Sequence, residues 1–276
     1  MKPAPFGYER PRDLQAALAV LGEAKTSAKI IAGGQSLGPM LNLRLVEPQL
    51  IVDITGLAEL KQVERRGDEL VLGACVTHAD IEDGRVADVT NGAMRAVAAG
   101  IAYRAVRNRG TIGGSLTNAD PAADWVSALS ALGAEVVVRG TGGVRTIAAE
   151  AFVTGALETS LTNGELLEAI RVPAHSKAAQ WGYYKTCRKT GEYAHAIGAV
   201  LLDRTRDVFR AVIGATERKP LVLADARPWF GGKYDLAAFD RSAADAALQA
   251  AGMADVLDRQ IHTVALARAI RQATAA

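Results

Sequence analysis

The chain has 276 residues, which is enough for two domains with ample buried cores. Hydrophobic residues make up 49% of it and charged residues 22%, a balance typical of folded globular proteins and not of disordered chains. A formal net charge of +2 and an aromatic content of only 5% argue against a nucleic-acid-binding surface or a base-stacking platform.

The first part of the chain, about 1–60, predicts a compact lobe. Apolar residues recur at helical spacing from Leu14 to Leu21, and this helix should end at Gly22. Strands are expected at 28–32 and 50–54, with a short helical turn at 40–45 between them. The first strand leads directly into the glycine-rich stretch IAGGQSL at 31–37.

A second lobe is expected over about 61–175. It should begin with a hairpin whose arms are 61–65 and 69–73, and Thr77 with Asp80 forms a capping box that predicts the start of a helix. The expected later elements are helices at 94–101 and 122–132, strands at 135–139 and 165–172, and a hairpin turn at 140–143.

The remaining chain predicts a smaller domain over about 178–276, after a polar boundary at 174–180. Strands at 181–185, 195–203 and 208–214 should form a three-stranded antiparallel meander, and the alanine-rich 236–274 should fold as about three helices. Strands followed by helices indicate an α+β fold.

Two glycine-rich stretches of similar design, IAGGQSL at 31–37 and TIGGSL at 111–116, are the main functional signal. Glycine accepts positive φ and has no Cβ, so such a turn can present backbone N–H groups to an anion. One Gly-Gly pair is most often an ordinary turn. Two of them predict a two-phosphate ligand held from both sides, by amides near Gly33 to Ser36 and at Gly113 and Gly114. No G-x-G-x-x-G occurs, and Pro39 stands where a P-loop needs Lys.

The two stretches, together with RNRG at 107–110 and TNADPAAD at 117–124, resemble the FAD-binding medium subunit of the molybdenum hydroxylases. This family includes bacterial carbon monoxide dehydrogenase and the flavin portion of xanthine dehydrogenase. The resemblance implies a two-lobed FAD-binding domain of the vanillyl-alcohol-oxidase (PCMH) type, followed by a small C-terminal domain. It also implies FAD lying extended between the lobes, with its ring near the C-terminal domain.

The resemblance also implies which residues contact the cofactor, and no catalytic residue is expected in this chain. The expected cofactor-binding residues are Ile30, Ile31, Ala32, Gly33, Gly34, Gln35, Ser36, Leu37, Ile101, Ala102, Thr111, Gly113, Gly114, Ser115, Asn118, Asp124, Leu167, Lys185 and Tyr193. Asp124 would accept from ribose or ribityl hydroxyls. Ile101 and Ala102 would line the adenine end, whereas Lys185 and Tyr193 would lie beside the isoalloxazine ring.

Each of these residues also has an ordinary structural interpretation. Asn118 and Asp120 could cap a helix. Ile101 and Ala102 fit an apolar helix face, Leu167 fits a core strand, and Lys185 and Tyr193 fit a surface strand and its loop.

The remaining chemistry points to partner chains. Cys75 and Cys187 are the only cysteines and lack C-x-x-C spacing, so this chain cannot ligate an iron–sulfur cluster. The four histidines share no metal-binding spacing, and no pattern supports hydrolysis. Gln35 stands where some relatives of the wider fold carry a flavin-linked His, so FAD should be non-covalent.

We therefore expect an electron-transfer subunit whose FAD passes electrons from a partner's iron–sulfur clusters to NAD+, oxygen or a quinone. A third chain would carry the molybdenum cofactor, in a heterotrimer or a dimer of heterotrimers. No leader or long apolar stretch is visible, so a cytoplasmic protein without a membrane span is expected. The alternatives are a self-contained flavin oxidoreductase of the same fold and a non-redox nucleotide-binding or assembly module.

Overall fold

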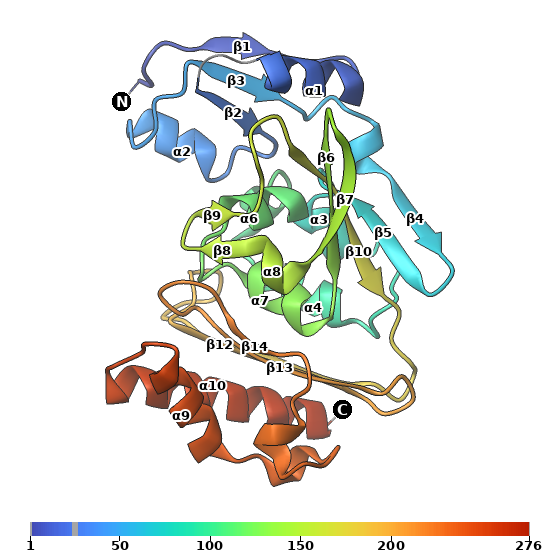
Figure 1. The fold of residues 1–276 in the computed structure, drawn as a ribbon, viewed down its shortest axis with the longest axis vertical. Helices are drawn as coiled ribbons and strands as arrows, with labels where there is room; N and C mark the ends of the chain where they lie inside the picture. Colours follow the sequence, from blue (N-terminus) through green and yellow to red (C-terminus); the bar gives the residue numbers. More distant parts are fainter. Residues whose placement is uncertain (1, 24–26, 276) are drawn as a thin grey trace.

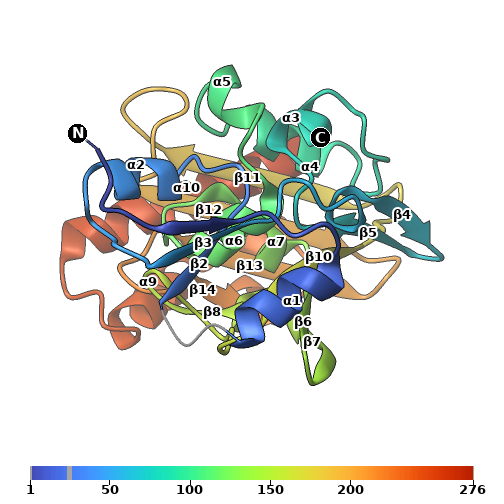
Figure 2. The ribbon, with the colours of Figure 1, turned by 90° about the horizontal axis from the view of Figure 1, so that it is seen from above.

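The computed structural model describes residues 2–23 and 27–275, and its elements stack in three layers (Figure 1). The first layer is a three-stranded parallel sheet in the order β1-β3-β2, seen from above in Figure 2. Its elements are β1 (Gly7–Glu9), α1 (Leu14–Glu23), β2 (Ala28–Ile31), α2 (Leu37–Asn42) and β3 (Leu50–Asp53).

Helix α2 begins earlier than the sequence predicts, at Leu37 instead of residue 40. Pro39 is tolerated there because the first amides of a helix have no acceptor within the helix. The glycine-rich stretch therefore connects the carboxyl end of β2 directly to the amino end of α2.

The second layer is a five-stranded antiparallel sheet in the order β4-β5-β10-β6-β7. Its strands are β4 (Val63–Arg66), β5 (Glu69–Gly73), β6 (Glu135–Gly140), β7 (Gly143–Ala148) and β10 (Leu166–Pro173). The helices and the small hairpin of this layer are α3 (His78–Glu82), α4 (Ala93–Ala99), α5 (Arg104–Arg107), α6 (Ile112–Asn118), α7 (Asp124–Ala131), α8 (Ala149–Phe152), β8 (Val153–Gly155) and β9 (Glu158–Thr159). Both predicted hairpins and the Thr77–Asp80 capping box are confirmed.

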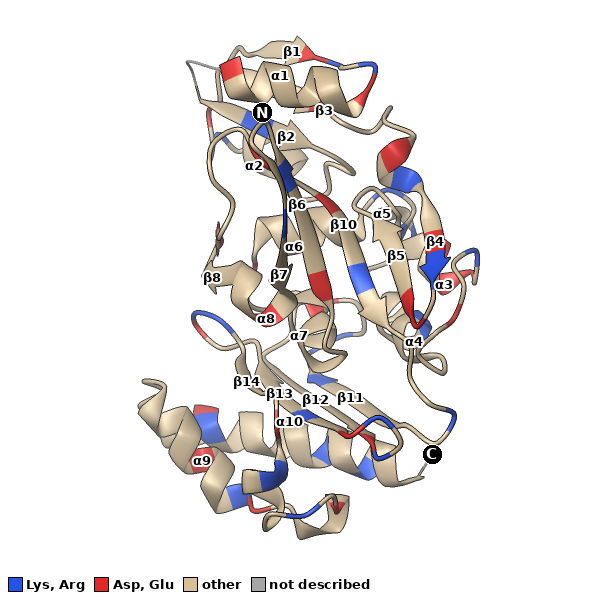
Figure 3. Cartoon of the chain, turned by 45° about the vertical axis from the view of Figure 1, so that its right-hand side comes forward, with Lys and Arg blue, Asp and Glu red and all other residues tan. Residues whose placement is uncertain are grey.

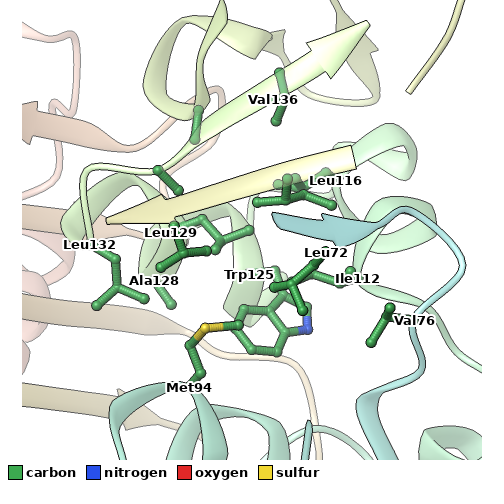
Figure 4. Close-up of a cluster of buried hydrophobic side chains, with 14 of the residues drawn as sticks. Leu72, Val76, Met94, Ile112, Leu116, Trp125, Ala128, Leu129, Leu132 and Val136 are labelled. Atoms are coloured by element: carbon green, nitrogen blue, oxygen red, sulfur yellow. The ribbon is translucent and has the colours of Figure 1, made fainter. Parts of the chain in front are cut away.

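The core of this layer lies between its sheet and its helices. Trp125 of α7 is fully buried and sits among Met94, Leu72 and Ile112 (Figure 4). Burial of such large apolar side chains stabilises the layer by roughly 1.5–3 kcal/mol each. This packing fixes the position of helix α7, whose first residue is Asp124, one of the expected cofactor-binding residues.

The second glycine-rich stretch is not a turn, as the sequence suggested, but the first part of helix α6. Thr111 caps this helix, since its side-chain oxygen accepts from the amide of Gly114 at 3.0 Å. Gly113 packs so closely on Ala74 that a Cβ would stand 2.5 Å from the Ala74 methyl group. The Gly-Gly pair here allows helix α6 to pack closely against Ala74.

The third layer is an antiparallel sheet of four strands, one more than predicted, in the order β11-β12-β13-β14. Its strands are β11 (Gln180–Thr186), β12 (Ala196–Asp203), β13 (Val208–Gly214) and β14 (Leu221–Leu223). The described residues beyond them form two α-helices, α9 (Arg241–Ala250) and α10 (Val256–Ala275), and two short 3-10 turns at Arg227–Phe230 and Leu236–Ala238. The expected three helices of 236–274 are thus two α-helices and one short 3-10 turn.

Helix α10 lies directly on this sheet because two strand positions are glycine. A Cβ on Gly182 would stand 1.8 Å from the Ala269 carbonyl oxygen, and one on Gly198 would stand 2.4 Å from Leu266. The other face of the sheet packs against α7 of the second layer, where Ala131 contacts Ala199 and Val212. Charged residues of both signs are spread along the chain in Figure 3, in keeping with its small net charge.

Candidate functional site

The loop between β2 and α2 presents a run of unpaired backbone amides. Within residues 2–23 and 27–275, no protein acceptor pairs with the N–H groups of residues 33 to 37. Gly34 has φ +70°, a conformation that favours glycine, and the Gln35 side-chain amide donates to the Gly33 carbonyl at 2.9 Å. Five successive unpaired amides form a cradle suited to an anion.

The second stretch does not add amides of this kind. Gly113 donates its N–H to the Ala74 carbonyl at 3.0 Å, and Gly114 donates to the Thr111 hydroxyl at 3.0 Å. The expectation that these two amides are exposed to a ligand is therefore wrong, because the helix cap and the neighbouring strand use them. What α6 can offer a ligand is side-chain chemistry, notably the hydroxyl of the half-buried Ser115.

The two stretches nevertheless lie side by side. A Cβ added to Gly33 would stand 2.0 Å from the carbonyl oxygen of Arg109, and one added to Gly114 would stand 3.9 Å from the Ala32 methyl group. The first loop is thus pressed against the chain that enters α6. The two stretches expected to hold one diphosphate therefore lie against each other, but only the first has unpaired amides.

A pocket of about 350 Å³ opens beside this contact, at the carboxyl ends of the parallel strands. It is lined by Arg10, Gly33, Thr55, Lys61, Cys75, Thr77, Asn108, Arg109 and Thr111. Three of these residues are cationic, so the surroundings of the first loop favour negative charge. Sequence reasoning missed the cations, because Arg10 and Lys61 come from segments with no motif. Burial raises the pKa of the Cys75 thiol to about 11, so this side chain stays neutral.

A second group of polar residues lies where α7 meets β11. The Lys185 ammonium donates to the Gly100 carbonyl at 2.8 Å and lies 3.0 Å and 3.1 Å from the two carboxylate oxygens of Asp124. Tyr183 donates its hydroxyl to Asp124 Oδ1 at 2.8 Å. The structure thus joins Asp124 and Lys185, which lie 61 positions apart in the chain, and adds Tyr183, which sequence reasoning missed.

Burial and charge act against each other in this group. The pKa of Asp124 is raised on balance, because burial raises it by more than the Lys185 ammonium and the Tyr183 hydroxyl lower it. The pKa of Tyr183 is raised well above its ordinary value by burial, with the Asp124 charge adding to the rise. Tyr183 therefore remains a hydrogen-bond donor at any physiological pH.

Tyr193 extends from the loop after β11 toward the first glycine loop. Partial desolvation raises the pKa of its phenol, Asp120 and Asp124 raise it further, and the Ser36 side chain lowers it. Tyr193 is thus close to Ser36 of the first layer and to two carboxylates of the second. Asp120 itself accepts from the Ala122 amide at 2.9 Å, so it forms a local turn and does not cap α7.

Ile101 and Ala102 lie at this same end of the site. Ile101 forms a β-bridge with Gly191, and a Cβ on Gly191 would stand 2.3 Å from the Ala102 carbonyl oxygen. Ile101 and Ala102 are expected at the adenine end, and Lys185 and Tyr193 beside the ring. The bridge from Ile101 to Gly191 and the hydrogen bond from Lys185 to the Gly100 carbonyl bring the two pairs to one part of the structure, and their assignment to the ends of the cofactor stays a prediction.

The other expected residues are more dispersed. Ile30 and Ile31 form the end of β2, Leu37 begins α2 and Asn118 ends α6. The Leu167 side chain is only 3% exposed and packs in the core of the second layer.

Residues 2–23 and 27–275 contain no group of three or more His, Cys, Asp or Glu that could hold a metal ion. None of their helices is both long and apolar enough to cross a membrane.

Comparison with known proteins identifies the family. Residues 4–175 match the model of the FAD binding domain in molybdopterin dehydrogenase. Caffeine dehydrogenase subunit beta of Pseudomonas sp. (strain CBB1) is 36% identical over 237 residues, covering 84% of this chain and 80% of that protein. The carbon monoxide dehydrogenase medium chain of Hydrogenophaga pseudoflava is 34% identical over 254 residues, covering 91% of this chain and 87% of that one.

Solved structures agree with this match. Carbon monoxide dehydrogenase from Hydrogenophaga pseudoflava superimposes with a TM-score of 0.86 at 32% identity, covering 100% of this chain and 99% of that chain. Quinoline 2-oxidoreductase from Pseudomonas putida 86 superimposes with a TM-score of 0.85 at 33% identity and the same coverage. The chain belongs to the family of FAD-binding medium subunits of the molybdenum hydroxylases.

Proposed function

We propose that this chain binds FAD non-covalently and acts as the electron-transfer subunit of a molybdenum hydroxylase. The observation that carries the proposal is the run of five unpaired amides at residues 33 to 37, which lies against the entry to α6. Membership in the family supplies the cofactor, and the amides supply the chemistry that would hold its pyrophosphate.

The residues present fit such a group. A side chain at Gly33 would meet the Arg109 carbonyl, so the two segments approach as closely as backbones can and leave the amides facing outward. Arg10, Lys61 and Arg109 line the adjoining pocket and favour an anion. The Thr111 and Ser115 side chains at α6 would add hydrogen bonds to the phosphates.

FAD, when bound, supplies a ring that accepts and releases electrons. Lys185 would hold its ammonium at the ring's N1 and C2=O edge and stabilise negative charge there. Tyr193 and Ile101 would cover the ring, since the bridge between Ile101 and Gly191 brings the loop that carries Tyr193 to Ile101. Gln35 carries no nucleophile for a covalent flavin link, in keeping with non-covalent binding.

The chain needs partners to complete the reaction. With only Cys75 and Cys187 it cannot ligate an iron–sulfur cluster, and the relatives it matches are named as medium chains or subunits of larger dehydrogenases. An iron–sulfur chain and a molybdenum-cofactor chain would form a heterotrimer with it, or a dimer of heterotrimers. The organic substrate would bind to the molybdenum-cofactor chain.

The domain organisation that accompanies this function is a two-lobed FAD-binding domain of the vanillyl-alcohol-oxidase type at about 1–175 and a C-terminal domain at about 178–276. Two observations support the boundary: the family model ends at residue 175, and a new sheet begins at Gln180. FAD would lie along the first two layers and reach the third at Lys185.

Two measurements test this function. Titration of FAD into flavin-free protein should quench flavin fluorescence with a stoichiometry of one per chain. Native mass spectrometry of the complex from its host should show two further chains that carry iron–sulfur clusters and the molybdenum cofactor. Failure to bind FAD, or recovery of the chain without such partners, would overturn the proposal.

A further inference from the structure

Two adjacent tyrosines of β11 point to opposite sides of the third sheet. Tyr183 lies on the side that faces the second layer, where its ring stacks with Trp181 at a centroid distance of 6.3 Å and its hydroxyl meets Asp124. Tyr184 packs against the core under α10, and its hydroxyl pairs with Arg268. The two side chains therefore lie on opposite faces of the sheet and pack in different cores.

Asp124 is a buried carboxylate whose side-chain partners are Lys185 and Tyr183. A buried charge requires both an opposite charge and filled hydrogen-bond positions, because it has lost its water. Lys185 supplies the charge and Tyr183 supplies a donor that never ionises at physiological pH. Without the Tyr183 hydroxyl, Asp124 Oδ1 would keep the Lys185 ammonium as its one side-chain partner.

Lys185 itself has three N–H donors. One is used by the Gly100 carbonyl, and the Asp124 carboxylate occupies a second direction. The remaining N–H is the one available to a ligand, and the Gly100 carbonyl and the charged Asp124 carboxylate together fix its direction.

We propose that Tyr183 is a positioning residue for FAD: it holds the Asp124 carboxylate charged and fixed, and thereby sets where Lys185 presents its free N–H to the flavin. This inference rests on the proposed function, because it takes Lys185 as a flavin contact. No substrate contact is assigned to Tyr183.

The physical consequence lies in the protonation of Asp124. A hydrogen bond to the charged form lowers the pKa of a carboxyl group, so removal of the Tyr183 hydroxyl must raise it. The groups acting on Asp124 are Lys185 and Tyr183 of β11 and its own backbone amide in α7, and Tyr193 feels its charge in turn. Once Asp124 is protonated, Lys185 loses its counter-charge and is oriented mainly by the Gly100 carbonyl.

The test is a pH profile of FAD affinity for Tyr183→Phe, with Tyr184→Phe as the matched control. Each variant removes one tyrosine hydroxyl from β11, and only that of Tyr183 contacts Asp124. A difference between the two variants therefore comes from the contact with Asp124 and not from a general change in the strand. Each protein is purified as it is produced, stripped of FAD and titrated with FAD between pH 5.5 and 9. The reduction potential of the bound FAD is measured over the same range.

Tyr183→Phe should bind FAD about tenfold more weakly than wild type at the acid end, within the range expected for one hydrogen bond to a charged group. Its affinity should return to within about twofold of wild type at the alkaline end, where Asp124 is ionised in both proteins. Tyr184→Phe should follow wild type throughout. A Tyr183→Phe profile that coincides with that of Tyr184→Phe would overturn the positioning role.

Lys185→Met separates this result from the underlying function. If Lys185→Met changes FAD affinity or potential and Tyr183→Phe does not, the flavin role of Lys185 stands and the role of Tyr183 is refuted. If Lys185→Met changes neither, Lys185 is not a flavin contact and the present inference is refuted with that assignment.

Discussion

Trp125 donates its indole N–H to Nδ1 of His78 at 3.1 Å, in the core of the second layer. His78 is the first residue of the capped helix α3, and its ring also lies 2.9 Å from where a Cβ of Gly110 would stand. The contact therefore ties α3 and α7 together just behind the entry to α6. Burial, followed by the charge of Arg107, lowers the pKa of His78 to about 4.

This lowered pKa predicts an acid-labile core. The unfolded chain binds a proton at His78 below its ordinary pKa of about 6.5, whereas the folded chain does so only near 4, so stability is complete above pH 6.5 and falls between those values. The contribution is about 3 kcal/mol in total. Urea unfolding at pH 7.5 and 5 should show a smaller pH effect in His78→Gln than in wild type. His175, whose pKa is also lowered to about 4 by burial, should still make its own contribution to the pH dependence of stability in that variant. His195→Gln, at an exposed position, is the control.

Gly33→Ala should push the first glycine-rich stretch away from the chain that enters α6. The new Cβ would stand 2.0 Å from the Arg109 carbonyl oxygen, a backbone atom that cannot rotate away. We expect a loss of about 1–3 kcal/mol in stability, as for other overpacked positions, and FAD affinity reduced at least about tenfold. Gly38→Ala is the matched control, because a Cβ there meets nothing within 4 Å. Wild-type FAD affinity in Gly33→Ala would show that the close approach is not needed for binding.

Asp124→Asn should destabilise the protein by about 3–5 kcal/mol, because it leaves the Lys185 ammonium buried without a counter-charge. The double variant Asp124→Asn with Lys185→Met should recover part of that loss, and a double-mutant cycle in urea measures the coupling. The exposed pair of Arg188 and Glu192 provides the comparison, at below about 1 kcal/mol. A coupling no larger than that of the exposed pair would contradict the assignment of a buried ion pair.

The two cysteines should react with thiol reagents at different rates. Cys75 is buried with its pKa raised to about 11, so almost none of it is thiolate at pH 8. Cys187 is partly exposed in the loop after β11 and should be labelled first. Peptide mapping after labelling with iodoacetamide checks the order, and Cys187→Ser should leave a protein that reacts only on unfolding. Rapid labelling of Cys75 in the folded protein would show that its pocket opens.

The first glycine loop could be predicted from the sequence because its signal is local. A strand followed by Gly-Gly needs the positive φ that Gly34 adopts. The second stretch has the same local signal, yet Thr111 caps it and the Ala74 carbonyl binds the Gly113 amide, so contacts made elsewhere in the chain turn it into a helix. Local pattern alone does not distinguish these outcomes.

The rest of the site depends on contacts distant in sequence. Asp124 meets Lys185 across 61 positions of chain, and Ile101 meets Gly191 through a β-bridge, so no local pattern encodes either contact. Tyr183 and Tyr184 are equivalent in the sequence, and only the strand's pleat decides which one faces Asp124. Strand β14, Leu221–Leu223, is too short to leave a periodic signal.

The loop after β11 carries Tyr193 from the third layer to Ser36 of the first, while the amides at 33 to 37 belong wholly to the first. The residues proposed to hold the pyrophosphate and those proposed to lie beside the ring therefore come from separate stretches of chain. Exchange of the C-terminal sheet between relatives would replace the surroundings of the ring, Lys185 included, and leave the amides at 33 to 37 in place.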